Sequence, residues 1–323
     1  MKKRAKILVA GSMNMDLIGT VSKFPEAGET IIGGEFRTAP GGKGANQAIQ
    51  AARLGADVTF VGKVGDDDFG KTLVSLAEKS GVDTSRIAVD KNCSTGVAQI
   101  EVKTDENGTE NRILVLPGAN MKITVSETEF LKEEIKNYDM VILQLEIPME
   151  INCAVARFAK DAGVPVMLNP APSSKIPSEL LECVTYISPN EHEAFDITGI
   201  APDNDETLKL SVAKLRDMGV GNALITLGKN GCVFSDGDEV IYSPCVECEK
   251  VVDPTAAGDS FVAAFCVAVS YGVSIRDALK FANCVGSLTV SKMGAQTSLS
   301  TLDEVFEFMK IRKIDTTPFN NIK

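Results

Sequence analysis

The sequence predicts an α/β fold with a mostly parallel central sheet, helices on both faces and a small β-sheet lid. Three observations predict it. Short β-branched apolar runs alternate with helical patterns along most of the 323 residues, and this alternation is typical of parallel sheets covered by helices. Two segments break the alternation with hairpin patterns. No Pro/Ser-rich linker or low-complexity tract divides the chain, so we expect a single domain over residues 1–323.

The strands of the body are expected at the short apolar runs. The first runs from Ile7 to Ala10 and is too short for the hydrophobic region of a signal peptide. The other candidate strands are DVTFVG, MVILQL, VPVMLNP, VTYISPN and NALITLG, and helical patterns between them include ANQAIQAARLG, EINCAVARFAKDAG and ETLKLSVAKLRDMG. In such sheets ligands bind at the carboxyl ends of the strands, so we expect the functional site there.

The lid is expected from two segments that no helical pattern follows, at about 16–38 and 95–117. The first contains Pro25 and Gly28, and the second turns through the DENG sequence at 105–108. Both have the pattern of a β-hairpin, and together they predict a small antiparallel sheet. Two interpretations are open at this point: a lid that excludes water from a site, or surface hairpins without a function.

Composition and charge exclude several classes of protein. A formal net charge of −11 would repel nucleic acid and anionic membrane surfaces, and no apolar run approaches the roughly 18 residues of a membrane span. Eight cysteines in apolar segments indicate reduced thiols and a cytoplasmic protein. The chain has one histidine, His192, which excludes His-dependent triads and most zinc sites. Cys245 and Cys248 have CxxC spacing without a second pair, so a metal or redox role is not favoured.

The segment Gly65–Thr72, GDDDFGKT, matches the P-loop pattern GxxxxGK[ST], but we do not interpret it as a phosphate cradle. Asp66, Asp67 and Asp68 would place negative charges where a P-loop holds phosphates. Asp68 is instead expected to cap a helix that runs to Lys79. No GxGxxG is present either, which removes the main sequence support for a dinucleotide-dependent oxidoreductase.

Two polar segments near the N-terminus are candidates for ligand binding. The sequence at 38–55 places a diglycine and Lys43 before a helix, where glycine lets a ligand approach the backbone and lysine supplies charge. Asn14 and Asp16 follow the first strand at a spacing that points both side chains to one side, which suits the vicinal hydroxyls of a sugar. The alternatives are a flexible turn with an N-cap and a loop of Asx turns.

The segment VVDPTAAGDSF, 251–261, is expected to begin an apolar helix that ends near Tyr271. Its small residues at 256–258 would leave the backbone N–H groups of the first turn open to an anion. Asp259 would lie beside that anion and could take a proton from a nucleophilic hydroxyl. The alternative is an acid that only stabilises its own helix.

The chain resembles the ribokinase-like carbohydrate kinases. The motifs that carry the resemblance are GSMNMD, PGGKGANQA, LQLE, LNPAP, SPNEHE, TLGKNG, DPTAAGD and KMGAQTS, in the order of the family and from Ile7 to about Ser298. The resemblance implies a sheet flanked by helices with a β-lid, and often a homodimer through the lids. This agrees with the two segments that break the strand and helix alternation.

The resemblance also implies roles for individual residues. The sugar would be bound by Asn14, Asp16, Gly42, Lys43, Asn46, Glu146 and Asp259. Asp259 would be the catalytic base, and the anion hole would be formed by Ala256, Ala257 and Gly258. ATP would lie along Asn190, Thr226, Gly228, Gly231, Gly258 and Asn283. Glu193 would place hydrated Mg²⁺. K⁺ would be held by Asp253 and the backbone carbonyls of Thr255, Lys292 and Gly294, with Ser298 nearby. Pro254 stands where many relatives have threonine, and it lacks an N–H and a hydroxyl beside that cation site.

The activity implied by the resemblance is transfer of the γ-phosphoryl group of ATP to the 5-hydroxyl of D-ribose, which gives D-ribose 5-phosphate and ADP. Deoxyribose, another pentose, fructose or a nucleoside are alternative substrates. A non-catalytic sugar-binding regulator is an alternative of a different class, and an intact Asp259 with its anion hole argues against it.

Overall fold

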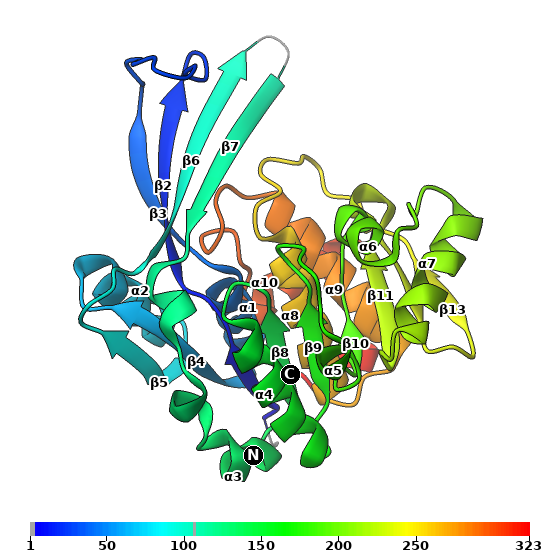
Figure 1. Cartoon of the computed structure of the whole chain (residues 1–323). Helices are drawn as coiled ribbons and strands as arrows, with labels where there is room; N and C mark the ends of the chain where they lie inside the picture. The colour runs from blue at the N-terminus through cyan, green and yellow to red at the C-terminus, as the bar shows by residue number, and fades with distance from the viewer. Residues whose placement is uncertain (1–3, 106–107) are drawn as a thin grey trace.

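The computed structural model describes residues 4–105 and 108–323, and Figure 1 shows a large sheet with a smaller sheet standing off it. The large sheet has the strand order β13-β12-β11-β10-β9-β8-β1-β4-β5 in the described residues. These strands are β1 (Lys6–Ala10), β4 (Asp57–Gly65), β5 (Val82–Asp90), β8 (Met140–Gln144), β9 (Val166–Asn169), β10 (Tyr186–Ile187), β11 (Asn222–Thr226), β12 (Cys232–Ser235) and β13 (Val240–Ser243). Neighbours from β5 to β11 pair in parallel, and only β12 and β13 add antiparallel pairs. The prediction of a mostly parallel sheet is therefore confirmed.

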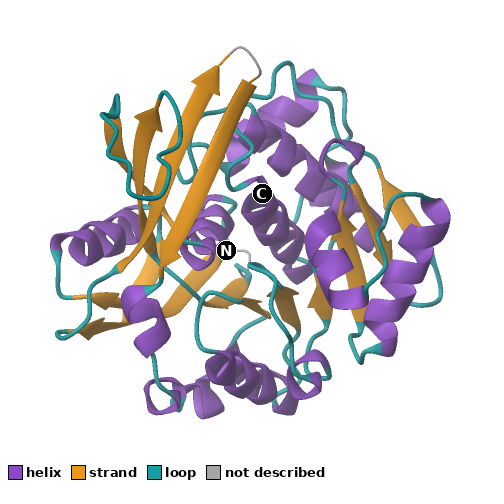
Figure 2. Ribbon diagram, turned by 45° about the horizontal axis from the view of Figure 1, so that its top comes forward, coloured by secondary structure: helices purple, strands orange, loops and turns teal. Residues whose placement is uncertain are grey.

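Alternate side chains of β1 enter two separate apolar clusters, one on each face of the sheet. Ile7 and Val9 belong to the first cluster, whereas Leu8 and Ala10 belong to the second, and all four are fully buried. The helices of the first cluster are α1 (Lys43–Arg53), α2 (Asp68–Lys79), α8 (Ala257–Ser270), α9 (Ile275–Val290) and α10 (Leu302–Ile311). Those of the second are α3 (Leu131–Glu134), α4 (Met149–Asp161), α5 (Ser178–Leu181), α6 (Glu191–Thr198) and α7 (Asp205–Asp217). Helices thus cover both faces, as the sequence predicts (Figure 2).

Short 3-10 helices connect several of these elements. They lie at Gly118–Lys122, Val125–Thr128, Ile135–Asn137, Gly228–Asn230 and Thr317–Phe319. Helix α8 is apolar all round because it lies inside the body, where it contacts α1 and α9, and its residues from Asp259 to Ala268 are buried. It ends at Ser270 with Tyr271 as its C-cap, close to the predicted end.

The lid is a second sheet with the order β3-β2-β6-β7. Its strands are β2 (Asn14–Val21), β3 (Phe36–Gly41), β6 (Gly96–Asp105) and β7 (Gly108–Leu116). The pairs β2–β3 and β6–β7 are antiparallel, which confirms the two predicted hairpins. The prediction of an antiparallel sheet is wrong at the central pair, because β2 and β6 run in parallel. Each of them continues outward from a parallel strand of the body, β1 and β5, so both leave the body in the same direction (Figure 1). Glu106 and Asn107 of the predicted turn lie outside the described residues.

Helix α2 begins one residue away from the predicted position of its cap. The N-cap is Asp67 rather than Asp68, since the Asp67 carboxylate accepts a hydrogen bond of 2.8 Å from the backbone N–H of Gly70. Asp67 also accepts bonds from the backbone and hydroxyl of Thr95. The helix start in the GDDDFGKT segment is thus occupied by a carboxylate of the chain, which agrees with our rejection of a P-loop. Within the described residues, no helix has the length and apolar character needed to span a membrane.

Candidate active site

The candidate base, Asp259, lies in the first turn of α8 and is 7% exposed. Its Oδ2 accepts a hydrogen bond of 2.9 Å from Asn46 Nδ2, and its Oδ1 accepts one of 2.9 Å from Gln47 Nε2. Both donors lie on α1, more than two hundred residues earlier in the chain. The structure therefore brings Asp259 and Asn46 together, as expected for one site.

The start of α8 has an irregular backbone. The helix begins at Ala257, and Ala256 is its N-cap in the left-handed region with φ of 61°, so Ala256 is not part of the first turn as the sequence analysis expected. The chain must turn sharply from Pro254 into the helix, and the N–H of Ala257 donates to the Pro254 carbonyl oxygen at 3.2 Å. No side chain caps α8, and the space beside Gly258 is open. This helix start suits an anion.

The diglycine before α1 is required by close contacts with β2. Gly42 is the N-cap of α1 with φ of 91°, and a Cβ atom on it would lie 2.7 Å from the backbone nitrogen of Asn14. A Cβ atom on Gly41 would lie 2.7 Å from both carboxylate oxygens of Asp16. The two glycines therefore let Asn14 and Asp16 lie directly against the start of α1.

Charged groups are concentrated around Lys43. The Glu146 carboxylate accepts bonds from the backbone N–H of Lys43, at 3.0 Å, and from the hydroxyl of Ser12. Burial alone would lower the pKa of the Lys43 ammonium, but the carboxylates of Asp259, Glu146 and Glu193 outweigh it and raise the pKa. Burial, with a smaller contribution from Glu146, raises the pKa of Asp16 to about 7. The charged side chains among the expected sugar ligands therefore lie close enough to influence one another's pKa values.

Asn120, in the 3-10 helix after β7, was missed by the sequence analysis. Its Oδ1 accepts the backbone N–H of Met13 at 2.9 Å, and its Nδ2 donates to the Met13 carbonyl oxygen at 3.0 Å and to Asn14 Oδ1 at 2.8 Å. A Cβ atom on Gly96 would lie 2.3 Å from both Asn120 Nδ2 and Asn14 Oδ1. No local motif marks Asn120, because its partners lie about a hundred residues earlier in the chain.

The residues expected at the nucleotide lie around the ends of β11 and β13. Asn190 is the N-cap of α6, forms a reciprocal capping box with Glu193 and is bridged to Thr226 at the end of β11. Gly228 and Gly231 flank the following turn with φ of 50° and 89°. Asn283 lies on α9, is 5% exposed and donates to Ser243 Oγ at 3.0 Å. Its amide thus supports the end of β13.

Glu193 faces the same cluster of charges as Lys43. Burial raises the pKa of its carboxyl, while the Asn190 N–H and the Lys43 ammonium oppose this effect and Asp259 adds to it. One oxygen, Oε2, accepts the Asn190 N–H at 2.9 Å in the capping box.

Asp253 joins the two segments expected to hold a monovalent cation. Its Oδ1 accepts the backbone N–H of Thr255 at 2.9 Å and the Thr255 hydroxyl, and its Oδ2 accepts the Gly294 N–H at 2.9 Å. Burial alone would raise the pKa of Asp253, but these bonds hold it below its usual range. The side chain of Lys292 points to Glu304, at 2.7 Å, so only its backbone carbonyl could serve the cation. The buried Ser298 hydroxyl donates to the Ala295 carbonyl oxygen. No cluster of three or more His, Cys, Asp or Glu side chains suited to a metal occurs among the residues described.

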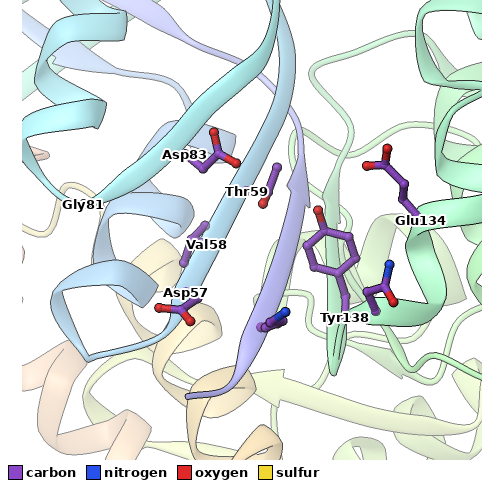
Figure 3. A pocket seen from close by; sticks show the side chains of 9 residues that line it. Asp57, Val58, Thr59, Gly81, Asp83, Glu134 and Tyr138 are labelled. Atoms are coloured by element: carbon purple, nitrogen blue, oxygen red, sulfur yellow. The ribbon is translucent and has the colours of Figure 1, made fainter. Parts of the chain in front are cut away.

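An open hollow of about 470 Å³ lies at the other end of the sheet, and Asp57, Asp83, Glu134 and Tyr138 surround it (Figure 3). It lies at the amino ends of the strands, because Lys6 and Asp57 are the first residues of β1 and β4. Ligands of parallel sheets bind at the carboxyl ends, where Asp259 and its partners lie, so we do not assign the function to this hollow.

The chain is similar to known proteins along nearly its whole length. Residues 4–302 match the model of the pfkB family carbohydrate kinases. Ribokinase of Bacillus subtilis is 42% identical over 94% of this chain and 99% of its own length, and a deoxyribokinase of Salmonella typhi is 30% identical over 95% and 99%. The solved structure of Arabidopsis thaliana ribokinase complexed with ribose and ATP has a TM-score of 0.88 and 35% identity, and the match covers 95% of this chain and 99% of that one. This chain therefore belongs to the pfkB family of carbohydrate kinases.

Proposed function

We propose that this protein is a ribokinase that transfers the γ-phosphoryl group of ATP to the 5-hydroxyl of D-ribose and releases D-ribose 5-phosphate and ADP. The observation that carries the proposal is the buried Asp259, which lies beside an uncapped helix start in a chain that matches a ribokinase along nearly its whole length. Positioned carboxylates and open helix starts are the groups that phosphoryl transfer requires. The proposal treats residues 1–323 as one functional domain.

In the proposed reaction, Asp259 accepts the proton of the sugar hydroxyl as that oxygen attacks the γ-phosphorus. Asn46 and Gln47 hold the carboxylate, so it needs little rearrangement. The backbone N–H groups of Ala256, Ala257 and Gly258 stabilise the negative charge of the phosphoryl group during transfer. Lys43 adds a positive charge close to Asp259.

The sugar is placed by side chains of β2, α1 and the loop after β8. The proposed sugar ligands are Asn14, Asp16, Gly42, Lys43, Asn46, Glu146 and Asp259. Support comes from the proximity of these residues. The Asp16 carboxylate packs against Gly41, and the Glu146 carboxylate accepts the backbone N–H of Lys43. In its charged form, Asp16 accepts hydrogen bonds from two neighbouring hydroxyls.

The nucleotide is placed along the ends of β11 and β13. The proposed ATP ligands are Asn190, Thr226, Gly228, Gly231, Gly258 and Asn283. Glu193 suits an outer contact to hydrated Mg²⁺, because the capping box uses only one of its two oxygens and Mg²⁺ usually keeps several waters. When bound with ATP, Mg²⁺ supplies charge that offsets the phosphates.

K⁺ is proposed as an activator at Asp253, Thr255, Lys292, Gly294 and Ser298. Support comes from the Asp253 carboxylate, which stays ionised and holds the Thr255 and Gly294 segments side by side. Backbone carbonyls and a carboxylate are oxygen donors that suit such a cation. When bound, K⁺ supplies positive charge beneath the start of α8, while Asp253 itself fixes the two segments.

A homodimer through the lids completes the proposal. Strand β7 exposes four consecutive apolar residues, of which Ile113 and Leu114 are 56% and 55% exposed, and Phe36 on the opposite edge is 69% exposed. Exposed apolar side chains on an unpaired sheet edge are a typical site of association. The proposal also includes a cytoplasmic location, which is supported by eight cysteines that are free thiols in the structure.

A coupled ADP-release assay over a panel of sugars tests the proposed function. We expect ribose to give the highest kcat/KM, with deoxyribose, fructose and nucleosides well below it. A deoxyribose kinase is the second candidate, because the match to the Salmonella typhi deoxyribokinase also extends over nearly the whole chain. A higher kcat/KM for deoxyribose would decide for it. Sugar binding without turnover would instead indicate a regulator.

A further inference from the structure

Gln47 uses its whole side-chain amide in contacts with other buried side chains. It lies on α1 and has no exposed surface. Its Nε2 donates to Asp259 Oδ1 at 2.9 Å and to Asn169 Oδ1 at 3.1 Å, and its Oε1 accepts from Gln144 Nε2 at 2.6 Å. Gln47 therefore connects α8, β9 and β8 at the carboxyl end of the sheet.

These contacts fix the direction in which the amide points. Asn169 donates through Nδ2 to the Ser188 carbonyl oxygen at 2.9 Å, so its Oδ1 faces Gln47 and needs a donor. A reversed Gln47 amide would place Oε1 against this oxygen and against the Asp259 carboxylate. It would also leave Nε2 facing the donor of Gln144. Gln47 can thus serve Asp259 only as a hydrogen-bond donor.

A second glutamine on the same helix shows what a purely structural amide does. Gln50 has no exposed surface either, but it donates to the Ser300 carbonyl oxygen at 2.8 Å and accepts the Ser300 N–H at 3.2 Å. It attaches the segment before α10 to α1 through backbone groups alone. A buried amide lowers stability unless its polar atoms form hydrogen bonds. Of these two glutamines, Gln47 forms one of its hydrogen bonds with the candidate base and Gln50 does not.

We propose that Gln47 is a positioning residue for Asp259. The inference rests on the proposed role of Asp259 as the base. Gln47 and Asn46 each bind one carboxylate oxygen, which prevents rotation of the group and leaves a free lone pair on each oxygen. Both donors are neutral amides, so they hold the carboxylate without adding a charge beside it. The charged groups that face Asp259 are Lys43 and Glu193.

The test compares the parent with Gln47→Met and Gln47→Glu in single-turnover rapid-quench measurements of ribose phosphorylation. For Gln47→Met we expect transfer about 10- to 100-fold slower, the loss that removal of a bond to a charged group produces. The KM for ribose should stay within about threefold, because Gln47 is not among the proposed sugar ligands and its amide is fully used by other side chains. The transfer rate falls at low pH, and this acid limb of the pH profile should move to higher pH, since the ionised base loses a hydrogen-bond donor. Gln47→Glu should move it further, because it adds a carboxyl group beside Asp259.

Gln50→Met is the matched control. It should lower the melting temperature and leave the transfer rate and the acid limb within about twofold of the parent. The proposal is overturned if both Gln47 variants lose stability but keep the rate and pH profile of the parent. Gln47→Glu preserves the side-chain volume, so it decides the question if Gln47→Met does not fold. A parent that phosphorylates no sugar sinks the proposed function, and that result is visible before any variant is made.

Discussion

The floor of the site, formed by Asp259 on α8 and Gln47 on α1, differs from the lid in how its side chains are held. On the floor, Asp259 and Gln47 are almost fully buried, and each makes at least two hydrogen bonds. On the lid, every residue of β7 is exposed. The groups proposed for chemistry are therefore fixed before substrate arrives, whereas the lid depends on substrate or a partner to be covered. Substitutions on the floor and on the lid test this contrast.

The largest effect is expected at the floor, from Asp259→Asn. The amide keeps the shape of the side chain but cannot accept the proton, so kcat should fall about 10²- to 10⁴-fold. Isothermal titration with ATP and circular dichroism should show unchanged nucleotide binding and fold. Activity within a few-fold of the parent would remove Asp259 from the role of base.

Asp16, near the start of lid strand β2, tests what the burial of a carboxylate beside the site costs. Because burial raises its pKa from 3.8 to about 7, the folded protein binds the proton more tightly than the unfolded chain does. Its contribution to stability is therefore lost as pH rises from about 4 to about 7. Without sugar, Asp16→Asn should be more stable than the parent at pH 8, by on the order of 3 kcal/mol. The difference should shrink toward pH 4, as urea unfolding can measure, and a difference independent of pH would contradict the assignment.

The same carboxylate should contribute to the choice of sugar. If charged Asp16 accepts bonds from the 2- and 3-hydroxyls of ribose, Asp16→Ala should lower kcat/KM for ribose by about one to two orders of magnitude. Deoxyribose lacks the 2-hydroxyl, so it should be a poorer substrate of the parent and should lose less on substitution. Equal losses for both sugars would mean that Asp16 does not read the 2-hydroxyl.

On the lid, Ile113→Asp should act on association more than on chemistry. A charge on the exposed face of β7 should weaken the proposed dimer about tenfold or more, as sedimentation over a concentration series can show. Leu210→Asp is the matched control, because Leu210 is 52% exposed on α7, outside the lid. If the two variants behave alike, the lid is not the interface.

The smallest effect is expected at the proposed cation site around Asp253, when sodium is exchanged for potassium at fixed ionic strength. A cation at Asp253 would act on the start of α8 without contacting sugar, so turnover should rise by roughly severalfold, well under the tenfold that 1.4 kcal/mol would give. Equal rates in the two salts would contradict the potassium site, and the departure at Pro254 would then be the first residue to examine.

Local patterns were sufficient for most of the fold and for the open start of helix α8. The apolar run at Ile7 to Ala10 predicts a buried strand without knowledge of its neighbours, and the small residues before Asp259 predict an open helix start. Both features depend on periodicity and on residue types within a few positions of one another. The family of carbohydrate kinases was also identified correctly, but from the resemblance of eight ordered motifs along the chain.

Features that depend on distant contacts were not predicted. The parallel pairing of β2 and β6 is set by the direction in which both strands leave the body. Gln47 and Asn120 lack a local signature because their partners are distant in the chain. The shift of the α2 cap to Asp67 is similar, since Thr95 supplies two of the bonds that hold that carboxylate. A run of three aspartates cannot show which of them has such a partner.

The hydrogen bonds of Asn120 join the last lid strand to a proposed sugar ligand. Asn120 follows β7 and holds both the Met13 backbone and Asn14 Oδ1. Displacement of β7 relative to β2 must either break these bonds or carry Asn14 with it. If Asn14 binds the sugar as proposed, the position of the lid and the affinity for sugar are coupled, and this coupling is reciprocal. If closure of the lid raises the affinity for sugar by some factor, bound sugar must favour the closed lid by the same factor. In a dimer formed through the two lids, this coupling would extend to the neighbouring subunit.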